Sequence, residues 1–235
     1  GDSVMIQSEF SDTVYAYYYS HQFEPARPPM AVRPTSGGGA LNIDTVFSLQ
    51  ADQFYTPDKL GLYFLQSDSS TTAGVSLLVT DGYFPKPQEI ADLTEPLIYI
   101  STRAEFQGIK EDLSSKQALD KFWLSTIGSP QRAKATISDF YQYIEDANTL
   151  FTSYKAGWKT DRGLIYSVMG PPLTVNKLLD GENWIYRDAA GEEIVFQFVK
   201  VSNIFSNNHY ELFRDKSYDR LWFNAIDRWR DGNNP

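Results

Sequence analysis

The stretch that decides the fold is Gly157-Trp158-Lys159-Thr160-Asp161-Arg162-Gly163, followed directly by Leu164-Ile165-Tyr166-Ser167-Val168-Met169-Gly170-Pro171-Pro172. Glycine adopts backbone conformations that a β-carbon forbids, and short polar side chains bond to nearby backbone groups, so both favour turns. The apolar run after Gly163 has the length of a buried strand, and two prolines would end it. The stretch therefore predicts two turns around one tryptophan and then a strand over residues 164–169.

A structural role is predicted for most residues of this stretch. Gly157 would take the left-handed conformation that ends a preceding helix. Trp158 would fold back as an anchor between that helix and a sheet. Thr160 and Asp161 would accept hydrogen bonds from backbone N–H groups of the turn that runs through Gly163.

Arg162 is expected to pair with Asp161 or with a neighbouring carboxylate. A functional alternative places Trp158, Asp161 and Arg162 around a cleft that grips a polymer or a peptide. Nothing in the stretch resembles a nucleophile with a positioned base, so no reaction is predicted there.

The chain around this stretch has the pattern of a small α+β domain over residues 113–235. Apolar residues recur at spacings of three and four before the stretch, and again near the C-terminus, as a helix buried on one side requires. Alternating strand-forming runs lie between them. The expected elements are helices from Ser114 or Ser115 through Leu124 to a stop at Gly128, from Pro130 to Tyr154 and from Ser217 to Gly232, and strands over 184–187, 193–201 and 204–214.

Residues 1–112 are predicted to form a second domain, an antiparallel β-sandwich. Short apolar or β-branched runs alternate there with turn residues such as proline, glycine, aspartate and serine. The whole chain is therefore expected to be an α+β protein of two packed domains. The strands expected in the first domain cover residues 13–19, 43–50, 60–66, 75–80 and 97–102.

Composition excludes several classes of protein. The 235 residues carry a formal net charge of −9, which repels nucleic-acid backbones. There is no cysteine, so disulfides, thiol nucleophiles and cysteine-bound metals are excluded. No apolar run is long enough to cross a membrane.

The search for catalytic motifs finds none. Two histidines, His21 and His209, are far apart and lack the spacing of a helical zinc site. Phosphate-binding and nucleophile-elbow glycine patterns are missing, so no cofactor, no metal site and no catalytic residue is predicted. Three adjacent carboxylate pairs have structural explanations at turns and on solvated helix faces: Glu111-Asp112, Glu145-Asp146 and Glu192-Glu193.

The stretch from Gly157 to Gly163 resembles the defining motif of the GWxTD domain family of Bacteroidetes and some other bacteria. The residues that match are Gly157, Trp158, Thr160 and Asp161, with Arg162 and Gly163 after them, the Gly170-Pro171-Pro172 stop and the closing helix with Trp222, Ile226 and Trp229. This resemblance covers roughly residues 113–232. Members of that family commonly carry export or lipoprotein leaders, so the resemblance implies an exported protein, periplasmic or associated with the outer membrane, whose leader has been removed. It implies no catalytic residue, because no activity is defined for the family.

The function expected from these observations is that of a non-catalytic cell-envelope protein that binds another envelope protein or assembles a surface complex. Tyr15, Tyr17 and Tyr19 alternate along one predicted strand and would form an open recognition face if the other face is core. One alternative is a glycan-binding module that uses exposed aromatic rings. Another is a hydrolase of unknown type with paired carboxylates, which would need two such groups in a pocket and a raised pKa on one of them.

Overall fold

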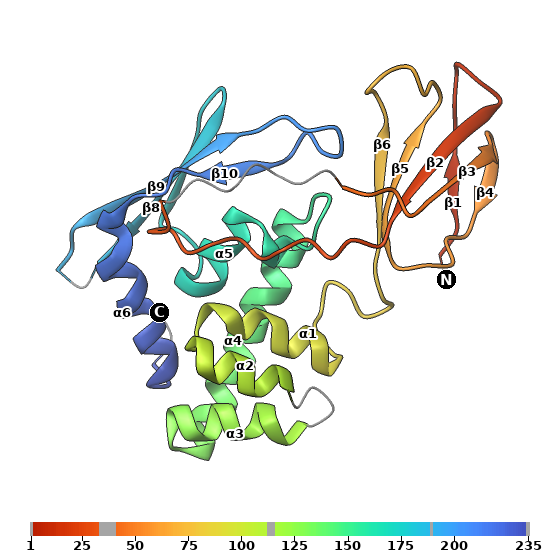
Figure 1. The fold of residues 1–235 in the computed structure, drawn as a ribbon. Coiled ribbons are helices and arrows are strands. Elements are labelled where there is room, and N and C mark those ends of the chain that lie inside the picture. Colours follow the sequence, from red (N-terminus) through yellow and green to blue (C-terminus); the bar gives the residue numbers. More distant parts are fainter. Residues whose placement is uncertain (1, 33–40, 112–115, 189, 234–235) are drawn as a thin grey trace.

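The computed structural model describes residues 2–32, 41–111, 116–188 and 190–233 (Figure 1). The chain is an α+β protein. A β-module lies at one end, a second sheet lies at the other end, and a group of helices packs beneath that second sheet (Figure 1). No helix in the described part of the chain has the length and apolarity needed to span a bilayer.

The β-module consists of a four-stranded antiparallel sheet with a two-stranded sheet on one face. The larger sheet has the order β3(Thr45–Gln50), β2(Thr13–Tyr19), β5(Gly61–Gln66), β6(Val75–Val79), and the smaller one pairs β1(Val4–Ile6) with β4(Gln53–Tyr55). Side chains alternate along β2 as the pleat requires. Those of Val14 and Ala16 are buried beneath Ile6 and Tyr55 of the smaller sheet. The expected β-sandwich is therefore present, with a narrow second layer.

The remaining elements form the α+β part of the chain. Its sheet is antiparallel with the order β10-β9-β8-β7. The elements are α1(Ile90–Thr94), the 3-10 helix η1(Glu95–Tyr99), α2(Arg103–Glu111), α3(Lys116–Ile127), α4(Pro130–Phe151), η2(Gly157–Lys159), α5(Asp161–Met169), β7(Thr174–Lys177), β8(Gly181–Arg187), β9(Glu193–Lys200), β10(Tyr210–Leu212), η3(Lys216–Tyr218) and α6(Asp219–Arg230).

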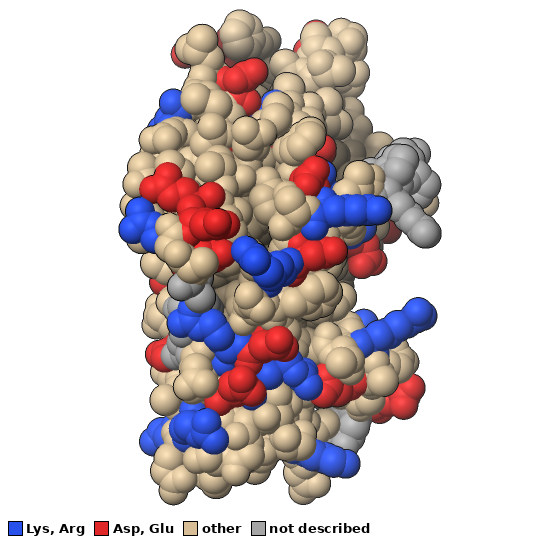
Figure 2. Space-filling model, turned by 90° about the vertical axis from the view of Figure 1, so that its left-hand side faces the viewer, with Lys and Arg blue, Asp and Glu red and all other residues tan. Residues whose placement is uncertain are grey.

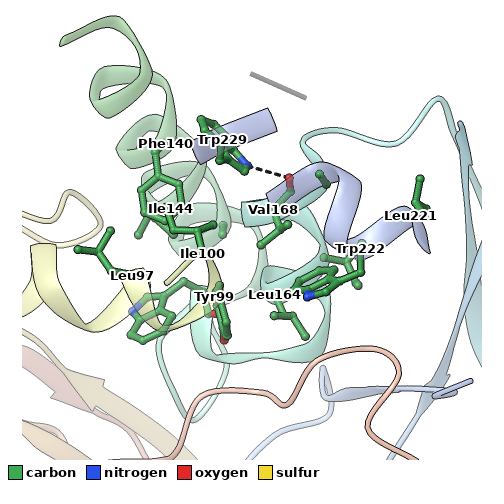
Figure 3. Packing of buried hydrophobic residues seen from close by; sticks show 14 of the residues in the cluster. Leu97, Tyr99, Ile100, Phe140, Ile144, Leu164, Val168, Leu221, Trp222 and Trp229 are labelled. Carbon is green, nitrogen blue, oxygen red and sulfur yellow. Dashed lines mark hydrogen bonds between the residues drawn. The ribbon is translucent and has the colours of Figure 1, made fainter. Parts of the chain in front are cut away.

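One apolar cluster joins the helices to the C-terminal sheet (Figure 3). Helix α4 crosses its centre, where Phe140 and Ile144 are fully buried. The indole of Trp229 on α6 packs edge-on against Phe140, and its nitrogen donates a 2.9 Å hydrogen bond to the carbonyl of Val168 on α5. Two aromatic helix residues therefore tie α4, α5 and α6 together.

The two parts of the chain share an aromatic contact. Tyr19 and Phe64, on the sheet face opposite the sandwich core, pack edge-on against Phe205 from the loop before β10. Tyr154, which follows α4, packs against Phe23 in the same cluster. One end of the sandwich is therefore attached to the C-terminal module through a ring cluster.

Several sequence predictions are confirmed. The hairpin of β8 and β9 is present, with Trp184 opposite Phe196. The helix predicted from Pro130 begins there after Ser129, and the last helix is followed by Gly232, whose φ of 71° is left-handed. The predicted helix start at Ser114 or Ser115 lies outside the described residues.

The strand predicted over residues 164–169 is wrong, because this segment is the helix α5. Thr160 caps it by accepting a 3.0 Å hydrogen bond from the N–H of Gly163, and Leu164 N–H bonds to the Thr160 carbonyl. The apolar residues Leu164, Ile165 and Val168 then share one buried face at helical spacing. A short apolar run alone cannot distinguish a strand from a buried helix, whereas the cap before it can.

Two further strand predictions are corrected. Residues 95–99 form the 3-10 helix η1, which has Pro96 in its first turn, where a missing N–H costs no hydrogen bond. In the strand predicted over 204–214, only residues 210–212 pair as β10.

The change from strands to helices lies between β6 and α1, before the expected boundary at 112/113. Ile100 and Ile109 therefore belong to the helical core.

An ion pair links α2 to α6 across this core. Arg230 donates to Glu105 at 2.8 and 3.0 Å, and this bonding lowers the pKa of the Glu105 carboxyl from 4.5 to about 2. A carboxyl group whose pKa is lower in the folded than in the unfolded state raises the free energy of unfolding at pH values above its unfolded pKa. This contribution is lost as the pH falls toward its folded pKa.

We therefore expect Glu105→Gln to lower the free energy of unfolding most at neutral pH, with a difference from wild type that shrinks as the pH falls from about 4.5 toward about 2. Urea denaturation at a series of pH values measures this difference. Glu111→Gln, an exposed position on the same helix, is the control. A difference that does not change with pH would contradict the assignment.

Candidate functional site

The GWxTD stretch lies where three helical segments meet with their backbones in contact. A β-carbon at Gly157 would lie 1.9 Å from the carbonyl oxygen of Ala147 on α4. A β-carbon at Gly163 would lie 1.9 Å from the carbonyl oxygen of Gly157. Both distances are far below van der Waals contact, so only glycine fits. Gly157 is therefore needed for close approach, and the left-handed helix end predicted for it is wrong, since its φ is not positive.

Trp158 is an internal anchor. Its side chain is 5% exposed and packs edge-on against Tyr99 of η1, with ring centres 5.7 Å apart. The Tyr99 hydroxyl donates a 3.0 Å bond to the Trp158 carbonyl, and Trp158 N–H donates to the side-chain oxygen of Asn148 on α4. Trp158 therefore links η2 to η1 through its indole and its carbonyl, and to α4 through its backbone N–H, where the sequence predicted a contact with a sheet.

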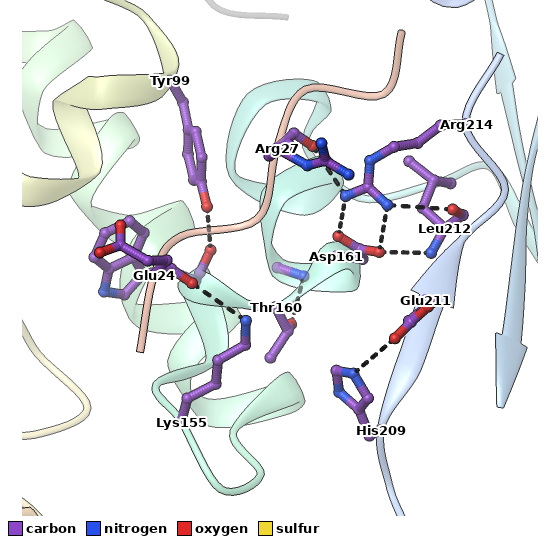
Figure 4. Close-up of polar contacts among 12 residues, drawn as sticks. Glu24, Arg27, Tyr99, Lys155, Thr160, Asp161, His209, Glu211, Leu212 and Arg214 are labelled. Atoms are coloured by element: carbon purple, nitrogen blue, oxygen red, sulfur yellow. Dashed lines mark hydrogen bonds and ion pairs between the residues drawn. The ribbon is translucent and has the colours of Figure 1, made fainter. Parts of the chain in front are cut away.

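Thr160 bonds to the backbone of the turn as predicted, whereas Asp161 does not. Thr160 donates to the Gly157 carbonyl at 2.7 Å and caps α5. Asp161 turns away from the backbone of its own turn. It accepts a 2.6 Å hydrogen bond from Leu212 N–H on β10 and two from the guanidinium of Arg214 (Figure 4). The aspartate therefore fastens the start of α5 to the edge of the C-terminal sheet.

Arg162 also joins the helix to the sheet. Its guanidinium stacks on the ring of Tyr210, with its carbon 4.0 Å from the ring centre, and lies 3.5 Å from a carboxylate oxygen of Glu182 on β8. It donates as well to the side chain and the carbonyl of Asn208. Burial lowers the pKa of this guanidinium, and the charge of Glu182 opposes that effect. The carboxylate partner of Arg162 is Glu182, and Asp161 pairs elsewhere.

An extended segment of the β-module, residues 23–30, crosses this junction; we call it the strap (Figure 1). The N–H of Ala26 bonds to the Lys159 carbonyl at 3.0 Å, and the Arg27 carbonyl accepts a 3.1 Å bond from Arg214. The Glu24 carbonyl accepts from the ammonium of Lys155 (Figure 4). Arg214 thus joins the strap to Asp161. This contact could not be predicted from the sequence, because Arg27 and Arg214 are distant in the chain.

A cleft of 280 Å³ lies beside the junction, between the β-module and the helices. Trp158 and Lys159 line its helical side, together with Asp92 and Glu95. The side formed by the β-module includes Asp81. Burial raises the pKa of Asp92 above its usual value, and the nearby charge of Asp81 adds to this effect. Glu95 pairs with Lys159 at 2.8 Å. Sequence reasoning missed these carboxylates, since Asp92 lies in α1, Glu95 begins η1 and Asp81 lies in the segment after β6.

The three tyrosines of β2 do not form one open face. Tyr15 is 39% exposed, Tyr17 is half-buried and Tyr19 is 5% exposed beneath Phe205. The opposite face of β2, with Val14, Ala16 and Tyr18, belongs to the core, which is the condition that the sequence analysis left open. The sequence could not show that a loop nearly two hundred residues away covers the other end of the strand. A recognition surface at Tyr15 and Tyr17 remains a prediction.

The other candidates singled out in the sequence have ordinary surroundings. Glu193 pairs with Arg187 at the surface, and Asp146 accepts bonds from Gln142 and Tyr166. Asp112 lies outside the described residues. His21 packs on Phe23 and His209 packs on Tyr154, and the rings of Phe23 and Tyr154 also contact each other. No group of three or more His, Asp or Glu side chains among the described residues is arranged to hold a metal ion.

Comparison with known families identifies the family to which the chain belongs. The model of the GWxTD domain matches residues 61–231, so the chain belongs to the GWxTD domain family. The match begins at β5 and therefore includes two strands of the sandwich as well as the helices, which is more of the chain than the expected residues 113–232. Comparisons with curated proteins and with solved structures found no match.

The Asp161–Arg214 pair is predicted to be a large local contribution to stability. Both side chains are mostly buried, so Asp161→Ala leaves an uncompensated guanidinium and should cost about 3–5 kcal/mol of unfolding free energy. Urea denaturation measures the loss. In a double-mutant cycle with Arg214→Ala, the loss of unfolding free energy in the double variant should be well below the sum of the losses in the two single variants.

The control is Glu193→Ala, which breaks the exposed pair with Arg187 and should cost less than about 1 kcal/mol. Equal losses of unfolding free energy in Asp161→Ala and Glu193→Ala would contradict a role for Asp161 in joining α5 to the sheet.

Proposed function

We propose that this protein is a non-catalytic interaction or assembly module of the cell envelope whose partner is another envelope protein. The observation that carries the proposal is the open edge of the C-terminal sheet at β7 and the apolar side chains around it. Its location in the envelope rests on the family resemblance alone. The large apolar residues exposed at this edge and on the adjoining sheet face are Leu173, Val175, Leu178, Leu179, Val195, Val199 and Phe213.

Within the described residues, strand β7 has a single strand neighbour, β8, and all four of its residues are exposed. A free edge of this kind offers unpaired backbone groups to another chain, and monomeric proteins usually protect such edges. Leu178 and Leu179 follow the strand, and Leu179 is fully exposed. An exposed apolar group beside an open edge is typical of a contact surface.

The defining motif supports a non-catalytic role. Its polar side chains are used to join α5, the C-terminal sheet and the strap, which leaves no free acid or base in the motif. Charged residues of both signs are interspersed on the face shown in Figure 2, which favours a protein over a nucleic acid as partner.

The glycan-binding alternative has less support. All five tryptophans are buried, the most exposed of them at 5%. The stacked ring pair, Phe196 with Tyr218, is buried as well. A flat sugar-stacking platform would need rings of this kind at the surface.

The proposal predicts that Leu178→Ser/Leu179→Ser abolishes recovery of the native partner. The measurement is cross-linked affinity purification from the envelope fraction of the source cell, with quantitative mass spectrometry. The matched control is Leu124→Ser/Leu150→Ser, at two exposed leucines on the helices. Equal recovery by both double variants would rule out the β7 edge as the contact.

A second candidate, a carboxylate-dependent hydrolase, is favoured by one observation. Asp92 has a raised pKa in a cleft that also holds Asp81, as a general acid paired with a second carboxylate requires. Hydrolysis of a glycoside or peptide panel that disappears in Asp92→Asn, with the fold intact, would replace the non-catalytic proposal. A panel with no wild-type turnover would dismiss this candidate for those substrates.

A further inference from the structure

The second layer of the β-sandwich covers the larger sheet incompletely. This layer has two strands, β1 and β4, whereas the sheet beneath has four. Val75, Leu77 and Val79 of β6 alternate toward the same side as Leu65, which belongs to the sandwich core. Val75 is nevertheless 69% exposed, and the other two are only half-buried. An apolar strip of the inner sheet face is therefore left without a covering strand.

A groove of 570 Å³ runs over this strip, between residues 4–10 and residues 73–77. Val14 and Leu65 form its floor, and Leu77 and Val75 continue the floor onto β6. The volume lies within the roughly 300–1,000 Å³ of sites that bind defined ligands. Apolar side chains spaced by two along the floor match the period of a β-strand.

One wall of the groove is a free strand edge. Strand β1 pairs with β4 on one side only, so its other edge has no strand neighbour in the described chain. Val4 and Ile6 point inward while Met5 is 47% exposed. A strand placed beside β1 would satisfy its unpaired backbone groups and cover the apolar strip of β6 at the same time.

The charge of the groove indicates what kind of strand it accepts. Glu9 is the one charged residue among those that line it, and it makes no ion pair within the described residues. A basic side chain at one end of the incoming strand would complement it. A second copy of this chain is disfavoured as the occupant, because both copies carry a net charge of −9.

We propose that this groove binds an extended segment of a partner protein, with alternating apolar residues and a basic residue at one end, which adds as a strand to β1 and completes the sandwich. The inference rests on the proposed interaction role. It concerns a different surface from β7, so the two proposals can fail separately.

The test uses nuclear magnetic resonance titration of the labelled chain with an end-blocked synthetic peptide, Lys-Val-Thr-Val-Thr-Val-Thr. We expect saturable shift changes confined to residues 4–10 and 73–77, and slower amide exchange in β1. The same peptide with N-methyl groups on alternate amides should bind at least tenfold more weakly, since it cannot pair with an edge strand. Shift changes elsewhere, no saturation, or equal binding of the methylated peptide would overturn the proposal.

Val75→Asp should raise the peptide Kd at least tenfold without unfolding the exposed site. Val46→Asp, at a 54% exposed valine on the opposite edge strand β3, should leave the Kd unchanged. Equal effects of the two variants would overturn the proposal. Sedimentation that shows a dimer dispersed by Val75→Asp would also overturn it, by making a second copy the occupant. If the groove fails these tests while partner recovery still depends on Leu178 and Leu179, the proposed function stands without it.

Discussion

The structure depends on the contact between the backbones of α4, η2 and α5 at Gly157 and Gly163. Each glycine faces a carbonyl oxygen at a distance that excludes any β-carbon. Packing at this distance places Trp158 inside the core and fixes the direction in which α5 leaves the turn. The contacts that Asp161 and Arg162 make with the C-terminal sheet depend on that direction.

Two charged pairs connect this junction of α4, η2 and α5 to the C-terminal sheet. Asp161 at the start of α5 binds Arg214 after β10, and Arg162 beside it binds Glu182 on β8. Adjacent residues of one helix thus hold two strands of the same sheet. Arg214 also binds the strap, so the β-module is fastened at the same place. Because these groups are buried, each is costly without its partner, and the set is expected to form together or not at all.

Two of the surfaces that remain available for function lie away from this junction. The β7 edge and the groove beside β1 are both incomplete edges of antiparallel sheets, and both expose apolar side chains. The cleft beside Trp158 differs, since its carboxylates and lysines suit a small polar ligand more than a strand.

The sequence by itself determined the α+β class, the sandwich, the long helix from Pro130, the β8–β9 hairpin and the family, because each depends on local periodicity, turn residues or a compact motif. It also indicated that the motif is a joint. Tertiary structure alone decided that residues 164–169 are a helix, that Asp161 pairs with Arg214, that Tyr19 is covered by Phe205 and that Asp81 and Asp92 share a cleft. The physical reason is that these outcomes depend on which distant groups pair with a buried charge or cover an apolar face. The spacing of residues along the sequence does not show which distant groups come into contact.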